Sequence, residues 1–327
     1  MDITKTHIEK DYKAGQPLLS SCFSRSGEYV FVGSEDYKVW RFQVSDGAKV
    51  EFDTDAWVRA LCISHDDKTL ITGGYDGRLI WWNAKSETSA PTQTINAHDG
   101  WIRTLALNPD GKTLASVGND KVVKLWDSTN GNLKQELKGH ESYVYNVVFH
   151  PDGKSLVTGD LYGNIFDWDL TTGEKKRSWV AESLTKYDKT FRAQIGGFRG
   201  MIFNEDGTQL ICSGITNVSN AFAGIGNPSV VIFDYTNGEQ IIEHLSKGPL
   251  KGVAWNVALH PEKFIISSTG GSGGYLLFWK PGEKEPFHQL KMPSDVRDFA
   301  LSPTGTHVAA VHSNSHLSIC KLDEKTT

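Results

Sequence analysis

Four arginines and two aromatic residues recur at one equivalent point of a repeated sequence phrase. They are Arg59, Arg103, Tyr145, Arg199, Trp255 and Arg297, and the first copy of the phrase has Leu19 there. The residue just before this point is apolar in all seven copies, as packing near a crowded axis requires. Packing does not require a base, and a guanidinium pairs bidentately with carboxylate or phosphate. The recurrence therefore predicts a site for an acidic or phosphorylated protein segment.

A structural interpretation of the same arginines stays open. Asp55, Asp295, Asp298 or similar carboxylates could hold them in local ion pairs. Aromatic residues precede three of the recurrent positions by two residues, namely Trp57, Trp101 and Tyr143. They could anchor a partner, or they could pack between neighbouring repeats.

The repeated phrase consists of two apolar residues, a turn resembling Ser-Pro-Asp-Gly-Lys, and a second apolar stretch. Its seven copies lie at Phe23–Gly27, Ile63–Lys68, Leu107–Lys112, Phe149–Lys154, Phe203–Thr208, Leu259–Lys263 and Leu301–Thr306. Short stretches rich in Val, Ile, Leu, Phe and Thr around a tight turn are typical of β-hairpins. No segment has a persuasive helical period.

An aromatic residue or its substitute follows each turn by a similar interval. These residues are Phe42, Trp82, Trp126, Trp168, Phe233, Trp279 and Cys320. A period of about 42 residues with four short strands per unit is the mark of propeller blades, which bury both faces only when neighbours stack on them. The sequence predicts an all-β, seven-bladed β-propeller of four-stranded antiparallel blades, forming a single domain over residues 1–327.

These units resemble WD repeats, with Gly139-His140 opening the fourth and Trp126-Asp127 and Trp168-Asp169 closing the third and fourth. The resemblance covers essentially the whole chain. It implies a buried hydrogen-bond relay of His, Ser or Thr, Asp and Trp in each regular blade. By position, the third blade keeps all four residues, as His98, Ser116, Asp120 and Trp126. The second blade has Thr54 in place of His, and the fourth has Tyr162 in place of Asp.

The last repeat supplies only three strands. Residues Ile3–Lys10 precede the first repeat, and we expect them, within a closing segment 1–12, to pair with the third strand of blade seven. This closure would remove the free sheet edges that invite aggregation.

The interval between Trp168 and Phe233 is longer than the others. Its excess falls at 181–196, between blades four and five, and at 215–228, inside blade five. The four strands of a blade are lettered a to d from the axis outwards. We expect both segments to be loops on the face of the ring that carries the b–c turns and the d–a connections. Because neighbouring strands are antiparallel, each innermost strand a also begins on that face. The first contains Lys186, Lys189 and Arg192 with Tyr187 and Phe191, and the second contains Phe222. In WD-repeat proteins the recurrent strand-a position lies at the mouth of the central channel and commonly contacts peptides. The resemblance therefore implies that the arginine point lies there.

Composition and motifs narrow the function classes. A formal charge of −5 argues against general nucleic-acid or anionic-membrane binding. The four cysteines have no C-x-x-C spacing, and His312 and His316 lack a third ligand, so we expect no metal and no cofactor. No secretory signal or apolar run of membrane length is present, which predicts a cytoplasmic protein.

The leading hypothesis is a non-catalytic scaffold. It would bind an acidic protein or peptide through the recurrent arginines and aromatics. The alternative is a propeller enzyme, hydrolytic or metal-dependent, with a site in the central channel.

Overall fold

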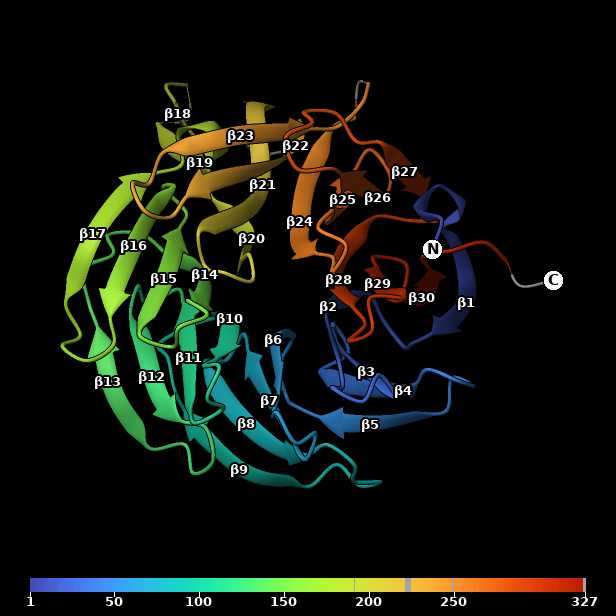
Figure 1. The fold of residues 1–327 in the computed structure, drawn as a ribbon. Coiled ribbons are helices and arrows are strands. Elements are labelled where there is room, and N and C mark those ends of the chain that lie inside the picture. Colours follow the sequence, from blue (N-terminus) through green and yellow to red (C-terminus); the bar gives the residue numbers. More distant parts are fainter. Residues whose placement is uncertain (191, 221–224, 249, 326–327) are drawn as a thin grey trace.

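The chain closes into a ring of seven four-stranded antiparallel blades (Figure 1). This computed structural model describes residues 1–190, 192–220, 225–248 and 250–325. Strands dominate, and the described residues contain only two short 3-10 helices, η1 (Ile3–Lys5) and η2 (Glu182–Leu184). The predicted fold class and blade number are confirmed.

Blades one to four follow one another along the chain, each built from the axis outwards. Blade one contains β2 (Leu18–Phe23), β3 (Tyr29–Ser34), β4 (Lys38–Gln43) and β5 (Lys49–Asp53). Blade two contains β6 (Val58–Ile63), β7 (Thr69–Gly74), β8 (Arg78–Asn83) and β9 (Pro91–Asn96). Blade three contains β10 (Ile102–Leu107), β11 (Thr113–Gly118), β12 (Val123–Asp127) and β13 (Leu133–Leu137). Blade four contains β14 (Val144–Phe149), β15 (Ser155–Asp160), β16 (Asn164–Asp169) and β17 (Lys175–Val180).

Blades five to seven complete the circle. Blade five contains β20 (Phe198–Phe203), β21 (Gln209–Asn220), β22 (Ile225–Asp234) and β23 (Gln240–Leu245). Blade six contains β24 (Gly252–Leu259), β25 (Ile265–Gly271), β26 (Tyr275–Trp279) and β27 (His288–Lys291). Blade seven contains β28 (Val296–Leu301), β29 (His307–His312), β30 (His316–Lys321) and, from the other end of the chain, β1 (His7–Lys13).

The hydrophobic core lies between successive blades. The recurrent residue of each third strand is buried in every blade: Phe42, Trp82, Trp126, Trp168, Phe233, Trp279 and Cys320. Each lies directly opposite an apolar residue of the second strand, as Trp126 does with Leu114. These side chains fill the space between sheets, which makes each blade dependent on its neighbours.

The buried relay is complete in blade three. His98 Nδ1 lies 2.9 Å from the Asp120 carboxylate, and its Nε2 lies 2.6 Å from Ser116 Oγ. Trp126 Nε1 donates to the same Ser116 Oγ at 2.7 Å. This network links the connection before the blade to its second and third strands.

Blade four corrects the expectation that its relay lacks an acid. Tyr162 does not take the acid's place, because Asp160, at the end of β15, turns its carboxylate to His140 at 2.9 Å. His140 Nε2 also lies 2.7 Å from Thr158 Oγ1, to which Trp168 donates. The acid comes two residues earlier than the blade-three spacing predicts.

The N-terminal closure is confirmed, with shifted bounds. Strand β1 pairs antiparallel with β30, the third strand of blade seven, from His7 opposite Lys321 to Lys13 opposite His316. Residues Ile3–Lys5 form η1 and not the start of the strand. Because the closing strand comes from the opposite chain terminus, it ties the two ends of the molecule together (Figure 1).

Asp11 of the closing strand also completes a polar cluster in blade seven. Its carboxylate accepts from Ser318 at 3.0 Å and lies 2.5 Å from His316 Nδ1. His312 is fully buried and contacts Ser318 Oγ at 3.0 Å. Its burial and this contact give His312 a structural role in the blade, similar to that of the relay histidines.

Candidate functional site

A β-bulge occupies the recurrent strand-a position in every blade. In β10, for example, Ile102 pairs with Gly118 and Thr104 pairs with Val117, so Arg103 between them has no direct partner. The same register shift falls at Leu19, Arg59, Tyr145, Arg199, Trp255 and Arg297. A bulge re-aims the side chain of its extra residue. Seven equivalent bulges on the innermost strands therefore direct seven side chains towards the axis.

Guanidinium groups and aromatic rings alternate around the channel mouth. Tyr145 lies between Arg103 and Arg199, whose guanidinium carbons are 4.6 and 4.8 Å from its ring centroid. Trp255 lies between Arg199 and Arg59, at 5.5 and 5.4 Å. Such cation–π contacts are attractive. They keep the three cations apart while holding them around one opening.

The hydrogen bonds of these three arginines go to neutral groups. Arg103 Nε donates to Asn119 Oδ1 at 2.9 Å, and its other nitrogens have no hydrogen-bond partner among the described residues. Arg199 donates to the carbonyls of Gly196 and Phe198 at 3.3 and 3.1 Å. Arg59 donates to the carbonyl of Leu19. Within the described parts of the chain, no carboxylate comes within 4.0 Å of these three guanidinium groups.

Arg297 differs from the other three. Its Nη1 lies 2.5 Å from Glu35 Oε1, on the turn between β3 and β4, and both side chains are partly exposed. This is the local ion pair of the structural interpretation, with a carboxylate that sequence reasoning did not single out. Asp55 instead pairs with Arg78 at 3.2 Å, and Asp295 accepts from the Gly271 N–H.

A cavity of about 290 Å³ lies in the channel. Its lining includes Arg59, Arg103, Arg199, Trp255 and Asp298. A smaller chamber of about 130 Å³ adjoins Tyr145 and the same three arginines. The space suits one compact polar group of a ligand and not a folded element.

The channel is short of negative charge. Burial raises the pKa of Asp298 to about 6, against the opposing effects of the Arg59 charge and of hydrogen bonds from the Ser21 N–H and Asn256. Burial lowers the pKa of Arg199 to about 10, and the charges of Arg59 and Arg103 lower it further, whereas Tyr145 raises it. Arg199 stays protonated at neutral pH. Among the described residues, the lining of the cavity therefore combines three guanidinium cations with one carboxyl group, Asp298, whose pKa is raised by burial.

The three aromatic residues before strand a lie on the outer rim of this mouth. Trp57, Trp101 and Tyr143 are 37, 40 and 41% exposed, so each presents part of its surface to solvent. Trp101 also lies over Arg103, with the guanidinium carbon 4.7 Å from its ring centroid. Tyr75, on the turn after β7, stacks on Trp101 at 4.1 Å and was missed by the sequence analysis. The sequence signal that could have identified Tyr75 is its position directly after Gly73 and Gly74, the two glycines that end the second strand of blade two.

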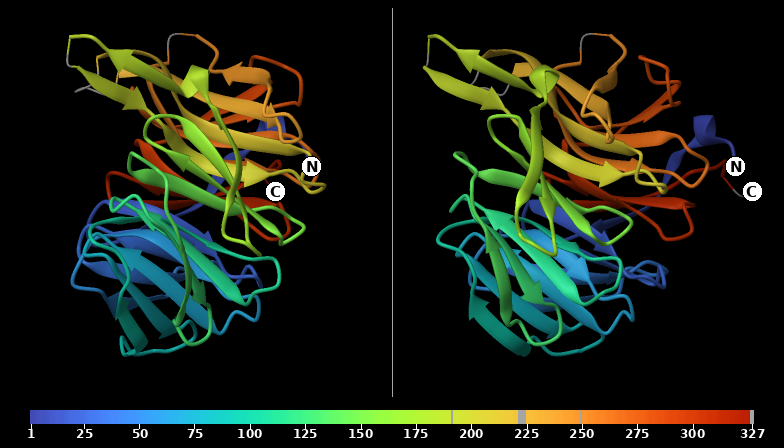
Figure 2. Two further views of the ribbon diagram at one scale, coloured as in Figure 1. Left: turned by 90° about the vertical axis from the view of Figure 1, so that its left-hand side faces the viewer. Right: turned by 60° about the vertical axis from the view of Figure 1, so that its left-hand side comes forward.

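The two segments expected to be loops contain paired strands over their described residues. In the first, β18 (Thr185–Asp188) pairs antiparallel with β19 (Ala193–Gly196), and both strands project from the ring (Figure 2). The other segment lengthens β21 and β22, which pair as far as Asn220 opposite Ile225. Lys186 Nζ bonds the Val218 carbonyl at 2.9 Å and so ties the first hairpin to β21. Phe191 and Phe222 lie outside the described residues.

The remaining chemistry-bearing residues are placed for packing. Burial raises the pKa of the four thiols, which keeps them protonated: Cys22 to about 11, Cys62 and Cys320 to about 12, and Cys212 also upwards.

Within the described residues, no group of three or more His, Cys, Asp or Glu side chains could hold a metal ion. None of the described helices has the length and apolar character needed to cross a membrane.

Comparison with known proteins gives one family. Residues 49–83, 89–127 and 131–168 match the family model described as WD domain, G-beta repeat. A search of curated proteins gave no match. The three matched stretches cover parts of blades one to four, which include the two blades with complete relays.

Proposed function

We propose that this WD-repeat seven-bladed β-propeller is a non-catalytic scaffold that binds an acidic or phosphorylated protein segment at the mouth of its central channel. WD-repeat propellers are typically protein-interaction scaffolds. The observation that favours an acidic partner is that three guanidinium groups line one cavity. None of the three has a carboxylate within 4.0 Å among the described residues.

Electrostatics favours an anionic ligand at this mouth. Arg59, Arg103 and Arg199 repel one another, and the cavity removes part of the water that would screen them. A carboxylate or phosphate between them would lower this repulsion and accept several charge-assisted hydrogen bonds. The free nitrogens of Arg103 are donors available for such bonds.

The rim supports recognition of a polypeptide and not of a bare anion. Trp57, Trp101 and Tyr143 lie along one arc of the mouth, just before the innermost strands of blades two to four. Partly exposed tryptophans and tyrosines are the residue types that most often anchor protein interfaces. An acidic side chain in the channel would bring the flanking peptide over these rings.

The test is binding of an oriented peptide library with a fixed central residue and randomised flanks. We expect peptides with central phosphoserine or glutamate to bind and those with central serine or lysine not to. The variant Arg59→Gln with Arg103→Gln should lose about tenfold or more of this binding, which corresponds to about 1.4 kcal/mol.

The matched control is Arg25→Gln, an exposed arginine on the turn between β2 and β3, on the opposite face. It should bind like the unchanged protein. Absence of selection for an acidic centre, or full binding by the double variant, would refute the proposed site.

A further inference from the structure

Three successive blades carry an acidic residue two positions before each rim aromatic. The pairs are Asp55 with Trp57, Asp99 with Trp101, and Glu141 with Tyr143. The other four blades lack the pattern, since blade five has Ile195 and Gly197 and blade six has Lys251 and Val253 at these positions. The repetition is therefore confined to one arc of the rim, over blades two to four.

Three aromatic side chains of blades two and three, Trp57, Tyr75 and Trp101, form a row that leads to the channel. Trp57 and Tyr75 have ring centroids 5.6 Å apart, and Tyr75 stacks on Trp101 at 4.1 Å with an interplanar angle of 14°. Trp101 then contacts Arg103. The row is continuous with the proposed acidic-ligand site, and Trp57 and Trp101 remain open to solvent.

The carboxylates beside these rings are available to a ligand. Asp99 and Glu141 are exposed, and neither has an ion pair with a residue that the structure describes. The Asp55 side chain is 83% exposed although it also contacts Arg78. An aromatic face next to a free carboxylate attracts a cation, both through the ring quadrupole and through the charge.

Charge is distributed unequally around the rim. The d–a connections and b–c turns over blades two to four contain five acidic residues, Asp55, Asp76, Asp99, Asp120 and Glu141, and two basic ones, Lys121 and Lys138. The connections before blades five and six, at 181–197 and 246–251, contain five basic residues, Lys186, Lys189, Arg192, Lys247 and Lys251, and two acidic ones, Glu182 and Asp188. A bound segment therefore meets opposite charges on the two sides of the channel.

We infer that the ligand is a charge-polarised peptide, whose acidic residue enters the channel and whose lysine or arginine side chains lie over the Trp57–Tyr75–Trp101 row. This inference rests on the proposed function and adds the charge of each flanking segment and the side of the channel on which that segment lies. The basic flank lies over blades two to four, and further acidic residues lie towards the basic hairpin β18–β19.

The same oriented library tests the inference when phosphoserine is fixed at the centre and lysine, alanine or glutamate is placed at each flanking position. We expect lysine on one side only to raise affinity about threefold per residue, the range of an exposed cation–π contact. The variant Asp55→Asn, Asp99→Asn, Glu141→Gln should lose this preference and still bind the phosphoserine peptide with alanine flanks. Trp57→Leu, made on its own in the unchanged protein, should also reduce the lysine preference.

Glu262→Gln, an exposed acid on the turn between β24 and β25 on the opposite face, is the control and should change nothing. Equal binding of lysine and alanine flanks, together with intact selection for the acidic centre, would overturn this inference and leave the proposed function standing. Loss of selection at the centre itself would refute the proposed function.

Discussion

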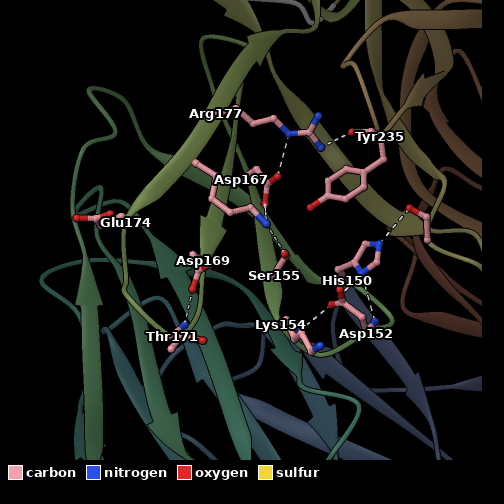
Figure 3. Close-up of polar contacts among 12 residues, drawn as sticks. His150, Asp152, Lys154, Ser155, Asp167, Asp169, Thr171, Glu174, Arg177 and Tyr235 are labelled. Atoms are coloured by element: carbon pink, nitrogen blue, oxygen red, sulfur yellow. Dashed lines mark hydrogen bonds and ion pairs between the residues drawn. The ribbon is translucent and has the colours of Figure 1, made fainter.

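Two groups of arginines in this molecule use the same aromatic stacking and differ in how their charge is compensated. At the seam of blades four and five, Arg177 on β17 lies 5.1 and 4.5 Å from the ring centroids of Trp179 and Tyr235. Its Nε donates to the buried Asp167 at 2.9 Å, and Nη2 donates to the carbonyl of Tyr235 (Figure 3). Nη1 donates to the carbonyl of Thr236 at 2.6 Å. Every part of this guanidinium is used by the protein itself.

The channel arginines stack in the same way on Tyr145 and Trp255, yet their hydrogen bonds go only to neutral groups of the described chain. Stacking alone therefore does not separate a structural arginine from a binding arginine. The partner of the charge does. Arg177 neutralises a carboxylate inside the fold, whereas Arg103 keeps its charge and most of its donors for a ligand.

Removing Arg177 should have the largest effect on stability. Arg177→Met leaves the Asp167 side chain, which is 1% exposed, without its main cationic partner. Because a buried charge that loses its partner is strongly destabilising, we expect the free energy of unfolding to fall by about 3 kcal/mol. Urea denaturation measures it. Adding Asp167→Asn removes the unpaired charge and should restore more than half of the loss. Wild-type stability of the single variant would show that this ion pair does not support the seam.

Arg103→Gln should give the opposite balance. Relief of repulsion from Arg59 and Arg199 offsets the lost contact with Asn119, so the free energy of unfolding should change by less than about 1 kcal/mol. Binding of the phosphoserine library should fall about tenfold, or 1.4 kcal/mol. A variant that unfolds early and binds normally would place Arg103 in the structural group with Arg177.

The sequence was enough to predict the ring and to align the channel residues. Hydrophobic periodicity and turn chemistry located all seven blades because each blade repeats the same packing problem. Alignment of the repeats by their turns places Arg59, Arg103 and Arg199 at equivalent positions from the sequence alone.

Local geometry was beyond the sequence pattern. The seven bulges leave no composition signal, because the extra residue is absorbed by a register shift between two strands. The ion pair between Arg297 and Glu35 joins blades seven and one, and these two residues are 262 positions apart in the sequence. Asp160 replaced the expected relay acid because a carboxylate two residues earlier reaches the same histidine.

Asp298 makes the channel sensitive to pH. Burial raises the pKa of Asp298 from 3.8 to about 6 in the folded protein. The stability that its protonated carboxyl group contributes is therefore fully present below pH 4 and is lost as the pH rises through about 6. Protonation also removes the negative charge beside Arg59. Binding of the glutamate-centred peptide, whose own carboxylate stays ionised over this range, should therefore strengthen severalfold from pH 7.5 to pH 5.5.

Asp298→Asn isolates this effect. With the glutamate-centred peptide, the variant should bind at pH 7.5 about as well as the unchanged protein does at pH 5.5, and its pH response over this range should vanish, as fluorescence anisotropy can measure. A pH response identical to that of the unchanged protein would show that Asp298 does not titrate in the channel.

The smallest expected effects concern Arg297, the recurrent arginine that resembles Arg177 in having a carboxylate partner. The Arg297 and Glu35 side chains are 32 and 23% exposed. Breaking their ion pair should therefore lower the free energy of unfolding by less than about 1 kcal/mol. Arg297→Gln should reduce peptide binding less than twofold. Glu35→Gln is the sharper change, since it would convert Arg297 into a fourth uncompensated cation at the mouth and should raise peptide affinity about twofold to threefold. If anisotropy titrations of Glu35→Gln show weaker binding, compensation by a carboxylate does not decide which of these arginines is available to a ligand.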